Sequence, residues 1–412
     1  MRKLFFLLAL IPLFTTAQEK GIHFEHGSTW AQIQAKAKAE NKYIFMDCFT
    51  TWCGPCRYMS ANIFPQEEVG AFFNSKFISV KVQLDTTKND NDEVKSWYKD
   101  GADIAKEYKV AVYPTYLFFA PDGTIVHRAV GSSDVKTFLA KAEAATNPDK
   151  QYYALLKKYQ AGEKAPDFLK KTALAAMDAY DMESAKKIAN EYIATQKNLY
   201  TKDNIDFVNK FTMSSSDKGF QLFLDNPDKV DAVIGKGKSY EKVLGIVLQE
   251  EVLAKLSNGR KLVDNPDWSA IQTAITAKYP KQATEAIAQG KVMYYQRKQD
   301  WGNFQGVIVA YMKDYGHKVG PETLNSYAWT VFENCPDMKC VKEALDWSKS
   351  SFKDNNNPAF IDTYANILYK MGNKEEALKW EEKAVSLASE NEKQTYQETI
   401  DKMKKGEKTW KM

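Results

Sequence analysis

Trp52-Cys53-Gly54-Pro55-Cys56 is the stretch on which the interpretation of this chain depends. It follows residues 43–49, a near-continuous apolar run typical of a buried central strand, and it opens residues 54–62, which we predict to be helical. A thiolate at a helix N-terminus faces unpaired backbone N–H groups and the positive end of the helix dipole, which lower its pKa. The pair therefore suits thiol–disulfide exchange. We expect Cys53 to be the exposed, attacking sulfur and Cys56, one turn inward, to release the product.

Alternating strands and helices surround this stretch. We predict helices over residues 28–41, 67–74 and 134–144, and strands over residues 77–84, 115–119 and 124–130. The last two strands flank Pro121-Asp122-Gly123, a turn sequence. Strand–helix alternation followed by a hairpin and a closing helix predicts a small α/β domain, with a central mixed sheet flanked by helices.

A helical region is predicted to follow this domain. Thr146-Asn147-Pro148-Asp149 breaks the alternating pattern, and beyond it the sequence predicts one helix after another. The last ninety residues contain a repeat, because residues 325–329 match residues 362–366 and residues 343–347 match residues 376–380. Paired helices with alanine at the crossing and Gly372 at the turn resemble tetratricopeptide repeats.

The predicted organisation has four parts. They are a signal peptide at residues 1–17, the α/β domain at 18–147, an α-helical region at 148–320, and tetratricopeptide-like helical repeats at 321–412.

Composition and the first residues bear on where the protein works. The chain has 412 residues, and 57 Lys and Arg against 53 Asp and Glu give a formal charge of +4 with both signs interspersed. This balance gives no electrostatic footprint for nucleic acid or anionic lipid. Arg2 and Lys3 precede a short apolar run and small residues ending at Ala17, the layout of a cleaved secretory signal. We therefore expect a periplasmic or secreted protein that begins near Gln18 and has no membrane span after cleavage; an uncleaved anchor is the alternative.

Beyond the cysteine motif the sequence resembles the thioredoxin family, periplasmic thioredoxin-like branch, over about 110 residues. Asp47, six residues before Cys53, stands where the family has a buried acid that is the proposed proton acceptor for the second cysteine. Lys81 stands where the family has the lysine partner of that acid. The resemblance therefore implies a thioredoxin fold and catalytic roles for Cys53, Cys56, Asp47 and Lys81.

The resemblance also implies a substrate-binding surface beside the sulfurs. Tyr113-Pro114-Thr115 matches the family's cis-proline site, whose backbone pairs with substrate, and Gly131 matches the glycine that leaves room for a bound peptide. Trp52 completes this expected substrate-binding set.

Three departures from the family pattern bear on substrate and redox direction. Ala61 stands where a proline usually kinks the active-site helix, and Arg57 replaces the usual lysine. The segment after Asp85, residues 86–107, is about a dozen residues longer than in a minimal thioredoxin. Because it leaves the carboxyl end of a strand next to the one that precedes Cys53, we expect it to border the cysteines and to help choose substrates; a harmless surface insertion is the alternative.

The remaining cysteines allow several interpretations. In an exported protein, close pairs are first interpreted as bridges or redox centres. The turn of the first repeat is longer than that of the second and holds Cys335 and Cys340, so we expect a structural disulfide there, with two free thiols as the alternative. A zinc site made from both pairs is disfavoured by the thioredoxin-like partners of the first pair. Cys48, on a buried strand, is expected to be an inert core thiol.

Together these observations predict a thiol–disulfide oxidoreductase that acts on disulfides of exported proteins. Gly54 and Pro55 offer no charge or side-chain donor to stabilise a Cys53 thiolate, which favours the reducing or isomerising direction. We expect no cofactor and no metal, an upstream thiol electron donor, and a protein partner on the helical region. The alternative is a non-catalytic scaffold or chaperone that binds partner proteins, although such a protein has no need of both sulfurs.

Overall fold

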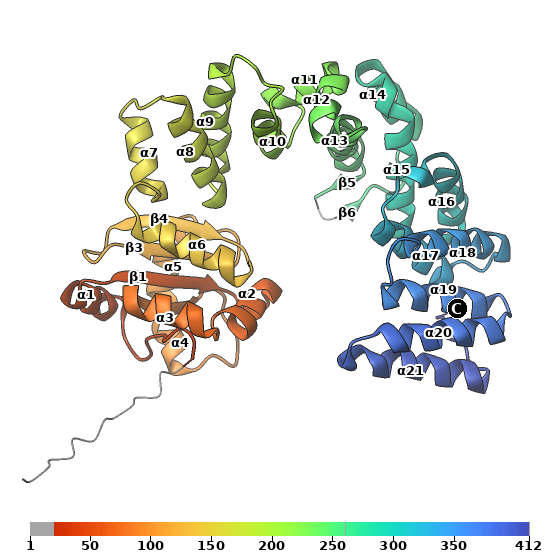
Figure 1. Cartoon of the computed structure of the whole chain (residues 1–412), viewed down its shortest axis with the longest axis horizontal. Helices are drawn as coiled ribbons and strands as arrows, with labels where there is room; N and C mark the ends of the chain where they lie inside the picture. The colour runs from red at the N-terminus through yellow and green to blue at the C-terminus, as the bar shows by residue number, and fades with distance from the viewer. Residues whose placement is uncertain (1–19, 260, 412) are drawn as a thin grey trace, which may run out of the picture. The chain divides into compact units, whose positions relative to one another are not determined.

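The computed structural model describes residues 20–259 and 261–411, and these form two compact units that divide between Leu199 and Tyr200 (Figure 1). The predicted signal peptide lies outside the described residues. Among the helices of the described residues, none has both the length and the apolar character needed to cross a bilayer.

A four-stranded mixed sheet organises the first unit. Its order is β2-β1-β3-β4, with bounds β1 Tyr43–Phe49, β2 Phe77–Gln83, β3 Thr115–Phe119 and β4 Ile125–Val130. The β1 strand pairs in parallel with β2 and antiparallel with β3, which pairs antiparallel with β4. The predicted mixed sheet flanked by helices is confirmed.

Helices cover both faces of the sheet, so β1 is buried on both sides (Figure 1). On one face Ile44, Met46 and Cys48 pack with residues of α1 (Trp30–Glu40) and α5 (Tyr98–Glu107). On the other face Phe45 lies in an aromatic cluster. That cluster takes in Phe73 of α3 (Glu67–Lys76), Phe118 of β3 and Phe138 of α6 (Val135–Thr146).

The helix that carries the cysteines changes its winding after one turn. The α2 helix, Gly54–Tyr58, passes into the π-helical turn η1, Met59–Ile63, where one regular helix was predicted. Ala61 lies inside this π-helical turn. A π-helical turn interrupts the regular i to i−4 hydrogen-bond ladder, as a proline does. The chain therefore departs from α-helical geometry at the site of the missing proline.

Three further helices belong to the first unit: α7 (Tyr152–Gln160), α8 (Pro166–Asp178) and α9 (Met182–Thr195). The backbone N–H of Tyr152 donates to Nδ1 of His127 on β4 at 3.0 Å. Burial lowers the pKa of His127 to about 4, so this ring is neutral and can accept that hydrogen bond. The compact unit thus continues past residue 147, where the sequence predicts the domain boundary.

The second unit is almost entirely helical, as the sequence predicts. Its α-helices are α10 (Lys202–Phe211), α11 (Lys218–Asp225), α12 (Pro227–Ile234), α13 (Lys238–Val247), α14 (Trp268–Lys278), α15 (Pro280–Lys298), α16 (Trp301–Tyr315), α17 (Pro321–Asn334), α18 (Met338–Ser351), α19 (Pro358–Lys370), α20 (Lys374–Leu387) and α21 (Glu390–Lys405). The second unit also contains the short elements η2 (Leu248–Val252), η3 (Leu253–Lys255), β5 (Ser257–Asn258), β6 (Lys261–Leu262) and η4 (Gly316–Lys318). The short helix α4 (Asp92–Ser96) belongs to the first unit.

The sequence repeat corresponds to two helix pairs, α17 with α18 and α19 with α20. The alanines matched between the repeats, Ala328 with Ala365 and Ala344 with Ala377, are all fully buried. Small side chains at these places let the paired helices approach closely.

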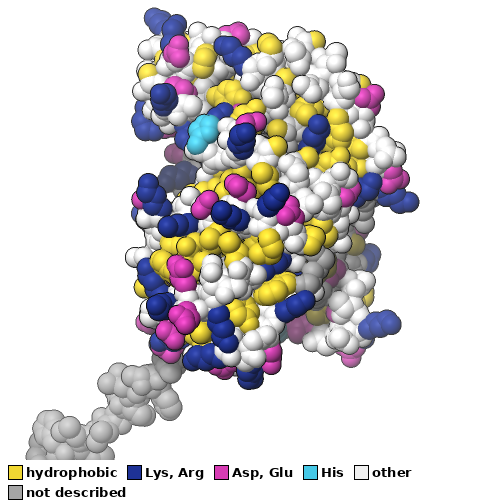
Figure 2. All heavy atoms as spheres, turned by 90° about the vertical axis from the view of Figure 1, so that its right-hand side faces the viewer, with side chains coloured by type: hydrophobic (Ala, Val, Ile, Leu, Met, Phe, Trp, Pro, Cys, Tyr) yellow, Lys and Arg dark blue, Asp and Glu magenta, His cyan; other side chains and the backbone are white. Residues whose placement is uncertain are grey.

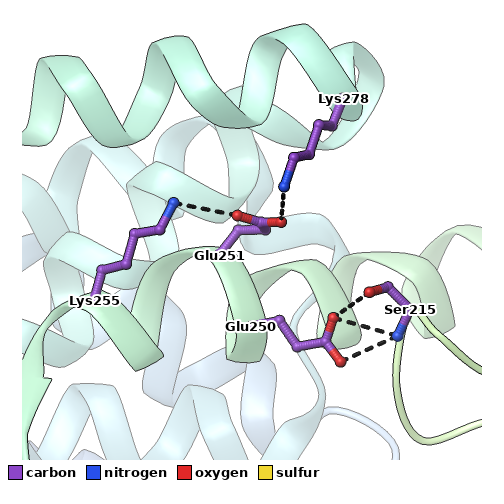
Figure 3. Close-up of polar contacts among 5 residues, drawn as sticks. All are labelled: Ser215, Glu250, Glu251, Lys255 and Lys278. Carbon is purple, nitrogen blue, oxygen red and sulfur yellow. Dashed lines mark hydrogen bonds and ion pairs between the residues drawn. The ribbon is translucent and has the colours of Figure 1, made fainter.

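Two neighbouring glutamates lie in a second π-helical turn, η2, in the second unit, and they bind different partners (Figure 3). Glu250 accepts hydrogen bonds from the backbone N–H and the hydroxyl of Ser215. Glu251 instead pairs with Lys278 at 2.7 Å and with Lys255 at 3.2 Å. Through these contacts η2 binds both the end of α14 and the loop before α11.

The surface of the second unit carries no area of a single charge on the face seen in Figure 2. Acidic and basic side chains alternate there, with apolar side chains between them. This distribution agrees with the near-neutral composition.

A buried pair of carboxyl groups lies between the last repeat helices. Glu381 of α20 is 0 % exposed and lies against Asp362 of α19, and no ion pair to either is formed within the described residues. Burial raises the pKa of both carboxyl groups, and the charge of Asp362 raises that of Glu381 further. The pair therefore retains a proton at neutral pH.

This proton makes the stability of the second unit depend on pH. The folded chain binds a proton at Glu381 that the unfolded chain releases above its usual pKa of 4.5, so the free energy of unfolding falls as pH rises from about 4.5 through neutrality. We expect Glu381→Gln to raise the free energy of unfolding by about 1–3 kcal/mol at pH 8.5 and by little at pH 4.5, as measured by urea unfolding. The exposed neighbour gives the control Glu382→Gln. An equal effect at both pH values would contradict the shared proton.

Candidate functional site

Cys53 and Cys56 form a disulfide at the start of α2, just beyond the end of β1. Cys53 is the N-cap residue, and the backbone N–H of Cys56 donates to its sulfur at 3.1 Å. The exposed fractions are 3 % for Cys53 and 4 % for Cys56. The expectation of an exposed first sulfur is therefore wrong for the oxidised state, because the disulfide holds the Cys53 sulfur against Cys56.

The residue before the motif is held from three sides. Thr51 donates its backbone N–H to Asp85 at 2.9 Å and its hydroxyl to the same carboxylate, and its carbonyl accepts a hydrogen bond from Arg57 at 3.0 Å. Asp85 follows β2, and Arg57 belongs to α2. These contacts fix the loop that carries Trp52 and Cys53.

The side chain of Asp47 lies on the face of the sheet that packs against the aromatic cluster. It lies on β1 two residues after Phe45 and is 1 % exposed. Burial raises its pKa to about 6, and the charge of Lys81 opposes that rise. The parallel register pairs Asp47 with Lys81 on β2, with 3.8 Å between Nζ and Oδ2. One oxygen, Oδ1, has no hydrogen-bond partner among the described residues.

Lys81 joins the acid to the active-site helix. Its ammonium donates to the hydroxyl of Ser60, in η1, at 2.6 Å, and it lies 5.0 Å from the ring centre of Phe49. Lys81, Ser60 and Cys56 all line a cavity of about 520 Å³. This cavity gives water a place beside the second cysteine and the lysine.

The residues expected to bind substrate gather near the start of β3, which pairs with the end of β1. The Tyr113–Pro114 peptide bond is cis, as the resemblance implies. Trp52 is 67 % exposed, and its ring meets that of Tyr113 edge to face at 5.8 Å. Thr115 is buried and donates its hydroxyl to the carbonyl of Val112. The Trp52–Tyr113 contact thus joins the residue before Cys53 to the residue before Pro114.

The backbone conformation at position 131 favours glycine. Its φ is +80°, in the region that favours glycine, and its N–H donates to the carbonyl of Pro114 at 2.9 Å. A Cβ built on Gly131 would meet nothing within 4 Å, so the space beside it is open. Both features suit a position where a peptide approaches.

The structure also shows the surroundings of Cys48 and of the segment after Asp85. Cys48 is a free thiol, completely buried, and burial raises its pKa. The segment after Asp85 is ordered by Asp90, which accepts hydrogen bonds from Gln83, Thr87 and Tyr98. Those bonds lower the pKa of Asp90. No cluster of three or more metal-ligating side chains lies within residues 20–259 and 261–411.

Sequence reasoning missed the contacts of Thr51, Asp85, Arg57 and Ser60. Asp85 had a usable signal, because a carboxylate at the carboxyl end of a strand beside the motif lies at the ligand-binding edge of such sheets. Ser60 had none, since its contact with Lys81 depends on the winding of η1.

Comparison with known proteins identifies this domain. The model of the thioredoxin-like domain family matches residues 30–146. Thioredoxin H4 of Arabidopsis thaliana is 34 % identical over 119 residues, which cover 28 % of this chain and 85 % of that protein. Thioredoxin-2 of Pyricularia oryzae is 36 % identical over 111 residues, 27 % of this chain and 54 % of that protein.

A more distant relative is the thiol:disulfide interchange protein DsbD of Pseudomonas fluorescens. It is 27 % identical over 108 residues, 26 % of this chain and 16 % of that protein. The chain thus spans about half of the fungal thioredoxin and a small part of DsbD. The matched residues contain the cysteine pair, the buried acid and the cis-proline described above, and through this domain the chain belongs to the thioredoxin family.

Proposed function

We propose that the protein is a thiol–disulfide oxidoreductase that reduces or isomerises disulfides of exported proteins through Cys53 and Cys56. The observation that carries the proposal is the Cys53–Cys56 disulfide at a helix N-terminus beside the buried Asp47. A protein that only bound partners would need neither the second sulfur nor a buried acid with a pKa of about 6.

The reaction exchanges one disulfide for another. The Cys53 thiolate attacks a substrate disulfide, forms a mixed disulfide and releases one substrate thiolate. Asp47 takes the proton of Cys56, and the Cys56 thiolate attacks the Cys53 sulfur. The second substrate thiolate leaves, and the Cys53–Cys56 disulfide remains. A thiol electron donor of the same chemistry returns the pair to the dithiol.

Substrate binding is assigned to the exposed side of the disulfide. An extended peptide laid along the backbone at Pro114 would have Trp52 on one side and the open space at Gly131 on the other. Asp85 and the segment after it would set the position of Trp52 through Thr51. The helical region, residues 148–412, would recruit a protein partner or orient the substrate.

The roles of the two cysteines can be separated by trapping. We expect Cys53→Ser to abolish reduction of insulin, because the attacking sulfur is lost. Cys56→Ser should accumulate mixed disulfides through Cys53, because nothing resolves them. The measurement is non-reducing electrophoresis with identification of the trapped proteins, and Cys48→Ala is the control. The assignment would be contradicted if Cys53→Ser formed mixed disulfides through Cys56 in the same amount as Cys56→Ser forms them through Cys53.

The buried acid predicts a pH dependence. Asp47 accepts a proton only when ionised, so resolution of the mixed disulfide should speed up as pH rises through about 6. We expect Asp47→Asn to slow this step about 10- to 100-fold at pH 7 and to remove the inflection. Lys81→Met should move the inflection to higher pH, because the lysine charge lowers the pKa of Asp47. Stopped-flow tryptophan fluorescence reports the step, because Trp52 adjoins Cys53.

The exposed carboxylate of Asp103 gives the matched control, Asp103→Asn. An inflection near pH 6 that survives in Asp47→Asn would assign the titration to another group.

The redox potential should be that of a reductant. Among residues 20–259 and 261–411, the donor to the Cys53 sulfur is the backbone N–H of Cys56, and Arg57 is engaged by the carbonyl of Thr51. Little stabilises the thiolate, so the disulfide is comparatively stable. We expect a potential of about −270 to −200 mV, against about −120 mV for a dedicated oxidant.

The measurement is a glutathione titration of the full-length chain with Cys335→Ser and Cys340→Ser. A potential near that of the dedicated oxidants would reject the reducing direction and leave the dithiol assignment in place.

A further inference from the structure

The second cysteine pair has features that the proposed function does not use. Cys335 is the C-cap residue of α17, and Cys340 is the third residue of α18. Both have free thiols, not the disulfide that the sequence predicts, and both are buried. Both belong to one cluster of buried side chains, and each acts on the pKa of the other. A disulfide between them would close the short turn that joins α17 and α18.

The surroundings of the pair favour a thiolate. The pKa of Cys335 is lowered because the Cys340 thiol donates to its sulfur, and the charge of Lys370 acts in the same direction. The Lys370 ammonium is held in place by the carbonyl groups of Phe332 and Cys335, the latter at 3.1 Å. A cation held close to a buried sulfur favours the thiolate over the thiol.

A cavity of about 400 Å³ reaches Cys340. It lies between α16 and α18, and Cys340 is one of its lining residues. Gly302 and Gly306, four residues apart on α16, line the opposite wall. A Cβ built at Gly306 would meet nothing within 4 Å, so packing does not require glycine there. Glycine is also a poor helix residue, and its effect here is to leave the cavity open.

The cavity also contains an unsatisfied polar atom. Oε1 of Gln305, a lining residue on α16, is buried and accepts no hydrogen bond from the described residues. A guest with an amide or ammonium donor would satisfy it. Asp337, Lys339 and Glu343 complete a lining of mixed charge, which suits a small zwitterionic molecule.

We propose that Cys335 and Cys340 are a second redox-active dithiol, which a low-molecular-weight disulfide oxidises after entering the cavity between α16 and α18. Cys340, which lines the cavity, attacks one sulfur of the guest while its proton passes to Cys335. A mixed disulfide forms, and one guest thiolate leaves and takes up that proton. The Cys335 thiolate then attacks the Cys340 sulfur and expels the second guest sulfur as a thiolate. One protein thiol, one protein thiolate and one guest disulfide become one protein disulfide, one guest thiol and one guest thiolate.

The sequence makes the product easy to detect, because trypsin cuts after Lys339, between the two cysteines. The full-length chain with Cys53→Ser and Cys56→Ser is equilibrated with mixtures of oxidised and reduced glutathione, alkylated and digested. We expect peptides 319–339 and 340–342 to be joined in oxidising mixtures and separately alkylated in reducing ones. In Cys335→Ser, glutathione should remain on Cys340. Both thiols alkylated in every mixture, while urea-unfolded chain forms the link, would overturn the proposal.

A second measurement tests the route. Gly306→Leu would fill the cavity, and we expect it to slow oxidation by oxidised glutathione at least tenfold, whereas Gly306→Ala should stay within about twofold of the parent. Gly302→Leu repeats the test from the neighbouring turn, and the unfolding midpoint of each variant checks that it is folded. Equal rates in folded parent, alanine and leucine chains would exclude the cavity as the route of entry. Because the Cys53–Cys56 pair is absent from these chains, neither result depends on the function proposed for it.

Discussion

The parallel pairing of β1 with β2 is the constraint on which the functional site depends. Its register puts Asp47 opposite Lys81, and it brings the ends of both strands to one edge of the sheet. The cysteine motif leaves β1 at that edge, and Asp85 follows β2 there, so the carboxylate can bind Thr51. A shift of one residue would turn Asp47 to the other face, because side chains alternate along a strand.

The same pairing explains how a charged group can remain in an apolar layer. Asp47 lies on the face of β1 that packs against aromatic rings, where an unpaired carboxylate would be costly. Lys81 lies close enough to moderate the effect of burial without removing it, since the pKa still stands near 6. The lysine is itself held by Ser60 and by ring faces, so its distance from the acid is set by the active-site helix. Lys81 therefore joins Asp47, the proposed proton acceptor, to the helix that carries the second cysteine.

The sequence predicts those parts of the molecule that depend on local pattern. The apolar run before the motif, the hairpin around Pro121-Asp122-Gly123 and the alanines of the repeat all have periodicities or turn residues that indicate their structure. Contacts that depend on register or winding could not be foreseen. Ser60 meets Lys81 because η1 is π-helical, and Glu381 lies buried although it stands in a Glu- and Lys-rich stretch that resembles a solvated face. The burial of Cys53 is that of the oxidised pair, and no residue pattern encodes an oxidation state.

The hydrogen bond between Tyr152 and His127 has a practical consequence for dissecting the molecule. A fragment cut at the predicted boundary near residue 147 would contain every residue of the thioredoxin-like site. It would lose α7, however, and so expose the imidazole of His127 and the apolar surface that Tyr152 and Leu155 now cover. Freed of that cover, the outer side of β4 becomes an open sheet edge of the kind that promotes association between chains. An expression fragment that ends near Leu199 keeps the edge covered and preserves the compact unit as the chain builds it.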